Sequence, residues 1–194
     1  GTETMIVTGL TIGNTYYIRI SHNGTYYGSN GSFTICNVAS APVGGDDLCT
    51  AVALPTVTSA CIYGTYDNSS MPINSSALPA GCSERANGLR RHMWFKFVVP
   101  TGGKVSINVK GLTGNITNPT VAAFSWNGGA CGTLTNFTLL SCNNDFCNVN
   151  GDCNYHSVLN LTGLTVGNTI YFKVSSASTD NGAGTFKICV SAPL

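Results

Sequence analysis

The chain has 194 residues, a formal net charge of +1 and only 9% charged residues. That length is enough for one full domain and a fragment with an apolar core. The sequence has no basic patch that would attract phosphates, so we do not expect nucleic-acid binding. No apolar run approaches the length of a bilayer span, so we do not expect membrane insertion.

The sequence predicts an all-β protein. Short alternating runs rich in Val, Ile, Thr, Tyr and Phe are separated by Gly, Asn, Asp and Pro, and no segment keeps a helical period over three turns. Residues 67–90 are polar and turn-rich and predict a long surface loop. In chain order the predicted strands are residues 16–21, 32–36, 93–99, 104–109, 120–126, 136–141, 156–161, 168–175 and 184–190.

One of these runs differs from the others. Residues 93–99, MWFKFVV, are almost wholly apolar and are followed by Pro100. Only Lys96 breaks the run, which indicates a central strand that is covered on both faces. Many short strands separated by turns favour an antiparallel two-sheet sandwich of the jelly-roll type.

The chain contains an internal repeat. Residues 7–37, VTGLTIGNTYYIRISHNGTYYGSNGSFTICN, match the region 159–190 at an offset of 154 residues that becomes 153 by the end. A self-match at fixed spacing indicates tandem structural units. We therefore expect residues 1–37 to be the closing strands of a preceding repeat, 38–45 a linker, and 46–194 a complete sandwich. We also expect residues 1–37 to need strands from a neighbouring repeat or another subunit, because they lack their own.

The nine cysteines indicate an oxidising compartment, so we expect an extracellular or cell-surface protein stapled by disulfides. Cys36 is the repeat copy of Cys189, so its partner should lie outside this fragment. Eight cysteines then remain for the complete unit. We expect the pairs Cys49–Cys61, Cys131–Cys142, Cys147–Cys153 and Cys82–Cys189, although spacing alone does not fix the connectivity.

Several segments together resemble a known family. They are DDLCTA, WFKFVVP, CGTL, LLSCNND, LNLTGLTVGNTIYFKV and GTFKICV, in that order between residues 46 and 190. The set resembles the β-sandwich repeats of secreted and cell-surface proteins of gliding and related Bacteroidota, which are similar to pre-peptidase C-terminal domains. The resemblance implies a non-catalytic module and export by type IX secretion. The insert at residues 146–154, FCNVNGDCN, departs from the family pattern.

Two sets of residues are candidates for binding. Carboxylate and amide oxygens grouped on loops suit Ca²⁺, which takes six to eight oxygen ligands, although Asp and Asn are also common turn formers. Related domains use carboxylates near the domain start for calcium, which adds to this prediction. Trp126 precedes a glycine-rich turn, where an exposed indole could stack on a sugar or simply pack. The predicted calcium ligands are Asp46, Asp47, Asn143, Asn144 and Asp145.

We expect a structural role for the chain. No nucleophile elbow, HExxH motif or other catalytic constellation is present, so we do not expect an enzyme. The leading hypothesis is a repeat module of an adhesin, filament or stalk, whose partners are neighbouring repeats or subunits of the same protein. The alternative is a carbohydrate- or surface-binding accessory domain of a secreted exoenzyme such as a protease.

Overall fold

The computed structural model describes residues 15–19, 44–74, 90–113, 116, 118–131, 133–144, 156–176 and 182–193. The chain divides into two compact units, Gly1–Ala39 and Ser40–Leu194, which we describe separately. Asp145, the insert at 146–154, and the cysteines Cys36, Cys82, Cys147 and Cys153 lie outside the described residues.

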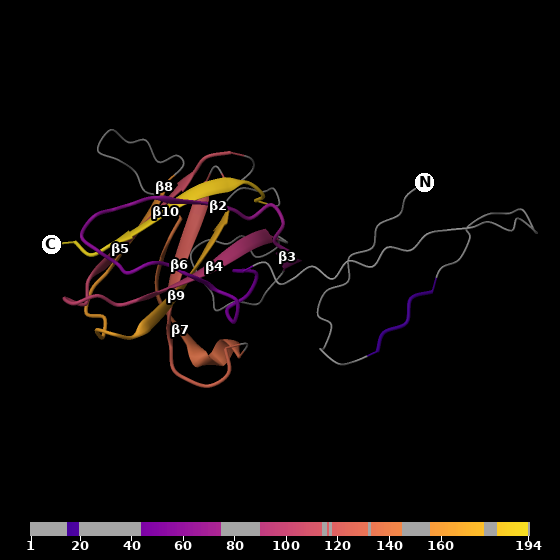
Figure 1. Ribbon diagram of the computed structural model, residues 1–194, viewed down its shortest axis with the longest axis horizontal. Coiled ribbons are helices and arrows are strands. Elements are labelled where there is room, and N and C mark those ends of the chain that lie inside the picture. Colours follow the sequence, from indigo (N-terminus) through magenta and orange to yellow (C-terminus); the bar gives the residue numbers. More distant parts are fainter. Residues whose placement is uncertain are drawn as a thin grey trace, which may run out of the picture. The chain divides into compact units, whose positions relative to one another are not determined.

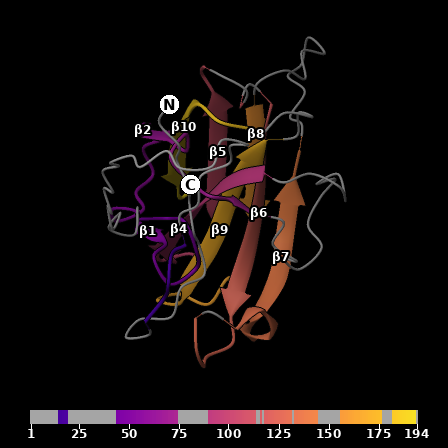
Figure 2. The same ribbon diagram turned by 90° about the vertical axis from the view of Figure 1, so that its right-hand side faces the viewer.

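The larger unit consists of two sheets (Figures 1 and 2). Sheet A, as we call the first, has the order β1-β4-β9-β6-β7, and β3 pairs with β4 outside this path. Its strands are β1 (Val52–Ala53), β3 (Ile73–Asn74), β4 (Arg90–Val98), β6 (Pro119–Trp126), β7 (Phe137–Asn143) and β9 (Thr169–Ser176). Sheet B has the order β2-β10-β5-β8. Its strands are β2 (Gly64–Asp67), β5 (Val105–Gly111), β8 (His156–Leu161) and β10 (Thr185–Ser191).

The predicted fold class is confirmed. All pairings within the two sheets are antiparallel except that of β1 with β4, and the described helix is a short 3₁₀ turn, η1 (Leu134–Asn136). Every predicted strand from residue 93 onward is present. The sequence analysis missed β1, β2 and β3, which have two to four residues and are too short to show an alternating pattern. In the described part of the chain, no helix is long and apolar enough to cross a membrane.

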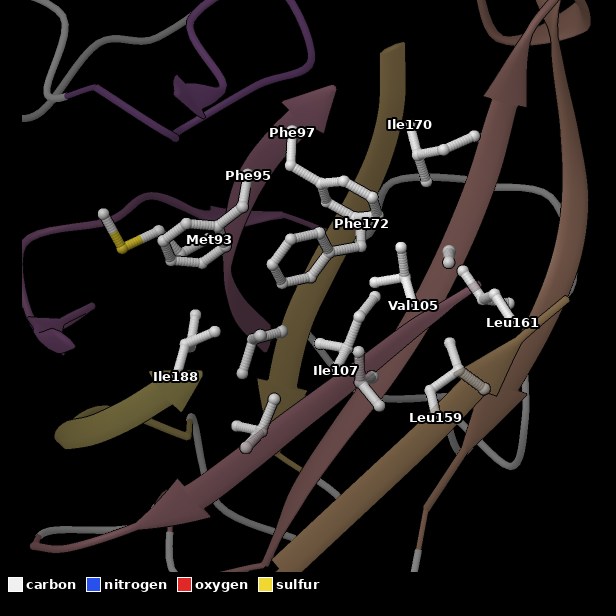
Figure 3. Packing of buried hydrophobic residues seen from close by; sticks show 14 of the residues in the cluster. Met93, Phe95, Phe97, Val105, Ile107, Leu159, Leu161, Ile170, Phe172 and Ile188 are labelled. Carbon is white, nitrogen blue, oxygen red and sulfur yellow. The ribbon is translucent and has the colours of Figure 1, made fainter. Parts of the chain in front are cut away.

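The main core lies between the two sheets (Figure 3). Phe95 and Phe97 of β4 point toward Phe172 of β9, and Ile107 of β5 approaches from the other sheet. The Phe95 and Phe172 rings are stacked with centroids 5.2 Å apart. Burial alternates along β5 because successive side chains point to opposite faces of a strand. Aromatic contacts also join the two layers, since the ring of Phe95 in sheet A meets the ring of Phe186 in sheet B edge-on, with centroids 6.2 Å apart.

Strand β4 is central, as predicted. It pairs with β1 and β3 on one side and with β9 on the other. Phe95 and Phe97 are buried in the core between the sheets, whereas Trp94 is 2% exposed on the opposite face. Both faces are therefore covered around Trp94 and Phe95, which explains the mainly apolar sequence, whereas Lys96 is half-buried and Val98 is 58% exposed.

The predicted disulfide pairs are wrong wherever the structure describes them. Cys49 is bonded to Cys131, and Cys61 to Cys189. Cys142 also forms a disulfide, with a partner outside the described residues. The prediction favoured pairs close in sequence for three of the four bonds, but the observed bonds span 82 and 128 positions. They follow from the fold, which brings the segment before β2 beside the β6–β7 loop and beside β10.

In the smaller unit only residues 15–19 are described. They carry no strand, and all five are exposed. The predicted strand 16–21 is therefore not formed over its described part. The predicted strand 32–36 and residues 38–43 of the predicted linker lie outside the described residues.

The core makes a first prediction about stability. Phe172 is fully buried between Phe95 and Phe97, so Phe172→Ala removes a ring and leaves a cavity. We expect this change to lower the free energy of unfolding by about 3–5 kcal/mol. Val98 lies on the neighbouring strand but is 58% exposed, and we expect Val98→Ala to cost less than about 0.5 kcal/mol. Urea unfolding of both variants measures this difference, and equal losses would contradict the assignment of the core.

Candidate functional site

The face of sheet A that points away from sheet B carries a second apolar cluster. Alternation along β4, β6 and β9 sends one set of side chains into the core and the other set to this outer face. The Trp94 and Phe124 rings are 5.6 Å apart, and the Phe137 and Tyr171 rings 5.2 Å apart. The buried members of the cluster are Leu48, Ala51, Trp94, Ala122, Phe124, Phe137 and Tyr171.

Residues 44–61, which we call the entry arm, supply part of the cover for this face. Leu48 and Ala51 pack into the outer cluster. The amide of Trp94 donates a 2.7 Å hydrogen bond to the carbonyl of Gly45. Gly45 has φ of +98°, and a Cβ added there would lie 2.9 Å from Cγ of Met93, so only glycine fits this close approach.

The entry arm is bonded to both layers of the sandwich. Cys49 is joined to Cys131 in the loop between β6 and β7, which belong to sheet A. Cys61 is joined to Cys189 on β10, a strand of sheet B. One short segment therefore links the two sheets covalently. Sequence reasoning missed this arrangement because it requires knowing which strands share a layer.

Asp46 and Asp47 shape a turn within the entry arm. Oδ1 of Asp47 accepts hydrogen bonds from the amides of Cys49, at 2.6 Å, and Thr50, at 3.0 Å. Oδ1 of Asp46 accepts a hydrogen bond from the Thr50 hydroxyl. These are the bonds of an Asx turn, in which the carboxylate replaces a backbone acceptor. Both carboxylates thus already have partners within the turn.

Asn143 and Asn144 lie elsewhere in the fold. Asn143 ends β7 and pairs with Val121, whereas the entry arm meets β4, where the Trp94 amide donates a hydrogen bond to the carbonyl of Gly45. Strands β9 and β6 lie between β4 and β7 in sheet A, and three strand spacings of about 4.8 Å separate β4 from β7 by about 14 Å. The described members of the predicted calcium set therefore do not come together at one point. No group of three or more His, Cys, Asp or Glu suited to a metal occurs among the described residues.

The surroundings of the two asparagines are nevertheless polar. The Ser157 hydroxyl donates a 2.9 Å hydrogen bond to the carbonyl of Asn144 and also bonds the carbonyl of Pro119. The amide Oδ1 atoms of Asn143 and Asn144 are buried and have no hydrogen-bond partner within the described part of the chain. The calcium prediction stays a prediction.

Trp126 lies at the rim of the outer cluster. It is the last residue of β6 and is 42% exposed. Its ring meets Tyr171 edge-on, with centroids 6.3 Å apart and planes at 75°. The turn beyond it is held by the Asn127 side chain, which donates a 2.9 Å hydrogen bond to the Thr138 hydroxyl. The indole is therefore held in a fixed position and accessible from solvent, as a stacking platform requires.

The histidines within the larger unit lie in different sheets. His92 is on β4 and His156 begins β8, where it pairs with Lys110. Burial lowers the pKa of His156, and the charge of Lys110 lowers it further. The imidazole of His156 is therefore neutral at pH 7, because its usual pKa of 6.5 is already below that pH.

Comparisons with known proteins add little to this site. No family model and no curated protein matches the chain. Among solved structures, one match is CorA, a surface-associated copper-binding protein important in copper acquisition by Methylomicrobium album BG8. The match covers 74% of this chain and the whole of the CorA chain. The identity is 10% and the TM-score is 0.38, values at which the likeness carries no argument about fold or function.

The turn geometry predicts how the two aspartates respond to mutation and calcium. Asp47→Ala removes an acceptor for two amides, and we expect it to cost about 1 kcal/mol of stability. If these oxygens bound calcium, the ion would raise the melting temperature. Because Oδ1 of both aspartates is engaged within the turn, we expect Asp47→Ala to leave any effect of millimolar calcium on the melting temperature unchanged. A rise with calcium that Asp47→Ala removes would contradict the purely structural role.

Proposed function

We propose that this chain is a non-catalytic repeat module of an extracellular adhesin, surface filament or stalk, and that it carries tension without extending. The observation that supports this role most directly is the Cys61–Cys189 bond. It joins the entry arm to the last strand and spans 128 positions of the sequence. Tension applied at the two ends of the larger unit passes along the arm, crosses this bond and leaves through the residues after Cys189.

The bond removes most of the unit from the path of the force. An extended chain reaches about 3.3–3.6 Å per residue, so the bypassed positions would add roughly 440 Å if released. Strands β2 to β9 lie within this closed loop. A module of this kind keeps its length under load for as long as the bond is oxidised. Secreted and surface proteins are the ones that keep such bonds.

Backbone pairing at the two ends of the unit supports the same role. Thr58 of the entry arm pairs with Ser191 in a parallel bridge, and the amide of Ala192 donates a 2.8 Å hydrogen bond to the carbonyl of Thr58. Because the paired segments run parallel, pulling on the two ends would shear this contact instead of breaking its hydrogen bonds one at a time. The Cys61–Cys189 bond lies close to this contact and would take the load if the contact failed.

The proposal includes the family suggested by the sequence. The ordered segments between residues 46 and 190 resemble the β-sandwich repeats of Bacteroidota surface proteins, and tandem repeats joined by short linkers suit a long, stiff stalk. Under this proposal the chain belongs to a gliding adhesin, and the resemblance implies export by type IX secretion. The internal repeat favours a serial module over a single binding domain.

Single-molecule pulling tests this function. Handles attached at Ser40 and at the C-terminus should give a short extension for the oxidised protein and about 440 Å more after reduction. Cys49→Ser with Cys131→Ser is the matched control, because the path through Cys61 and Cys189 keeps its length, and we expect the short extension to remain. The double variant Cys61→Ser with Cys189→Ser should show the long extension without any reduction. An oxidised wild-type protein that extends as far as the reduced one would contradict the proposal.

A second candidate function, carbohydrate or surface binding as an accessory domain of a secreted exoenzyme, is favoured by the exposed indole of Trp126. The protein has two tryptophans, and Trp94 is buried, so quenching by a ligand reports on Trp126. Titration with cellohexaose or chitohexaose should quench the fluorescence if the indole stacks on a sugar. Trp126→Phe should keep part of the affinity, measured by calorimetry, and Trp126→Ala should abolish it. Equal affinities for wild type and Trp126→Ala would exclude this site.

A further inference from the structure

The face of sheet B that points away from sheet A carries a row of basic side chains. Strands β2, β10, β5 and β8 lie side by side in this order (Figure 2). Lys187 of β10 is directly opposite Lys110 of β5, and Lys110 is directly opposite His156 of β8. We call these residues the basic row. They are far apart in the sequence, so the row becomes visible only when the strands pair.

The side chains of the basic row point to solvent and not into the core. Phe186 and Ile188 flank Lys187 along β10 and are buried between the sheets. Successive side chains point to opposite faces of a strand, so Lys187 lies on the outer face. The same alternation leaves Lys110 exposed at the end of β5, and Lys187 and His156 are half-buried. The row is therefore accessible from outside the sandwich.

The charges of the row are placed against one another. Lysines that stand directly opposite each other on paired strands repel and destabilise a sheet. Burial and the charge of Lys110 lower the pKa of His156, so its imidazole is neutral at pH 7 and offers ring nitrogens for hydrogen bonding. The four strands of sheet B contain one acidic residue, Asp67 of β2, whose Oδ1 accepts a 2.7 Å hydrogen bond from the amide of Ser69. The strands of sheet B therefore hold more positive than negative charge.

The side chains beside the row are mainly polar and uncharged. Asn108 and Ser106 follow Lys110 on the same face of β5, and the Asn108 carboxamide donates a 3.1 Å hydrogen bond to the Ser106 hydroxyl. Asn160 of β8 is opposite Ser106 and is exposed. Hydroxyl and carboxamide groups both donate and accept hydrogen bonds, as the hydroxyls of a sugar do. The face thus combines a line of positive charge with groups that suit sugar hydroxyls.

We propose that the basic row binds an acidic polysaccharide, a sugar chain that carries carboxylate or sulfate groups at intervals. Charge complementarity carries the inference: Lys110 and Lys187 would each pair with an anionic group, which relieves their mutual repulsion. From Lys187 to His156 the row spans two strand spacings, about 10 Å, enough for a piece of sugar chain with more than one anionic group. Trp126 lies on sheet A, so this surface is separate from the indole considered above.

Two other polyanions suit this face less well. Recognition of an anionic membrane takes clusters of about four to eight Lys or Arg, whereas the four strands of sheet B contain two. Single-stranded nucleic acids stack their bases on aromatic side chains. The Phe and Tyr side chains of these strands, Phe186 and Tyr66, pack in the core between the sheets. A sugar chain of moderate charge is therefore the polyanion that this face fits best.

Sugars with matched backbones test the proposal. Dextran and dextran sulfate differ in charge alone, and oligogalacturonate carries carboxylates instead of sulfates. We expect the full chain to bind dextran sulfate, oligogalacturonate or both by biolayer interferometry, more weakly as salt is raised, and not to bind dextran. Absence of binding to both acidic sugars would overturn the proposal. Binding at least as tight to phosphatidylglycerol vesicles or to single-stranded DNA would overturn it in favour of a membrane or a nucleic acid.

Matched charge variants locate the binding surface. Lys110→Gln removes the central charge of the row, and we expect it to weaken binding about fivefold or more, whereas Lys110→Arg should keep most of the affinity. Lys96→Gln removes the same charge from β4 of sheet A. The sheets pack about 10 Å apart, and charges farther apart than about 10 Å are screened at 0.1 M salt, so Lys96→Gln should leave the affinity unchanged. Equal losses for Lys110→Gln and Lys96→Gln would show attraction to net charge alone and would overturn the site.

The melting temperature separates binding from folding. Because Lys110 opposes Lys187, we expect Lys110→Gln to melt at or above the temperature of the wild-type protein. A clear fall in melting temperature would show that the fold needs Lys110 and would overturn its assignment to binding. Trp126→Ala should keep the affinity for acidic sugars. The pulling experiment depends on neither lysine, so failure of this inference would leave the mechanical role of the module unaffected.

Discussion

The Cys61–Cys189 disulfide is the constraint on which the rest of the structure depends. It joins the segment through which the chain enters the sandwich to the last strand before the chain leaves. Together with Cys49–Cys131 it ties the entry arm to both sheets. In the chain-entropy model, closing a loop of about 100 residues stabilises the folded state by about 4–5 kcal/mol. That is comparable with the whole stability of many domains, about 5–15 kcal/mol.

Packing and disulfides act on the same elements. The core between the sheets centres on Phe95 and Phe172, and the outer cluster on Trp94 and Tyr171. Strands β4 and β9 thus contribute to two apolar layers, and the outer layer is covered in part by Leu48 and Ala51 of the entry arm. Without the arm, aromatic side chains on sheet A would face water. The Cys49–Cys131 bond holds that cover in place.

The sequence predicted the long strands and the two-sheet architecture well, because alternation and turn residues are local signals. Residues 93–99 were recognised as a central strand since both faces needed apolar side chains. The disulfide pairs were not predictable, because Cys61 and Cys189 are brought together only by the placement of β10 in sheet B beside β2. The spatial arrangement of the predicted calcium ligands was not predictable for a similar reason. Asp47 lies in the arm that contacts β4 and Asn143 ends β7, and the sequence does not show that β9 and β6 lie between these two strands.

Peptide mapping of the non-reduced full chain tests the central claim most directly. Digestion between the cysteines, followed by mass spectrometry, identifies which cysteine peptides are joined. A peptide containing Cys61 joined to one containing Cys189 would support the path by which the unit bypasses tension. A peptide pair that joins Cys61 to Cys49 would contradict it, because the strands from β2 to β10 would then lie in the path of the force.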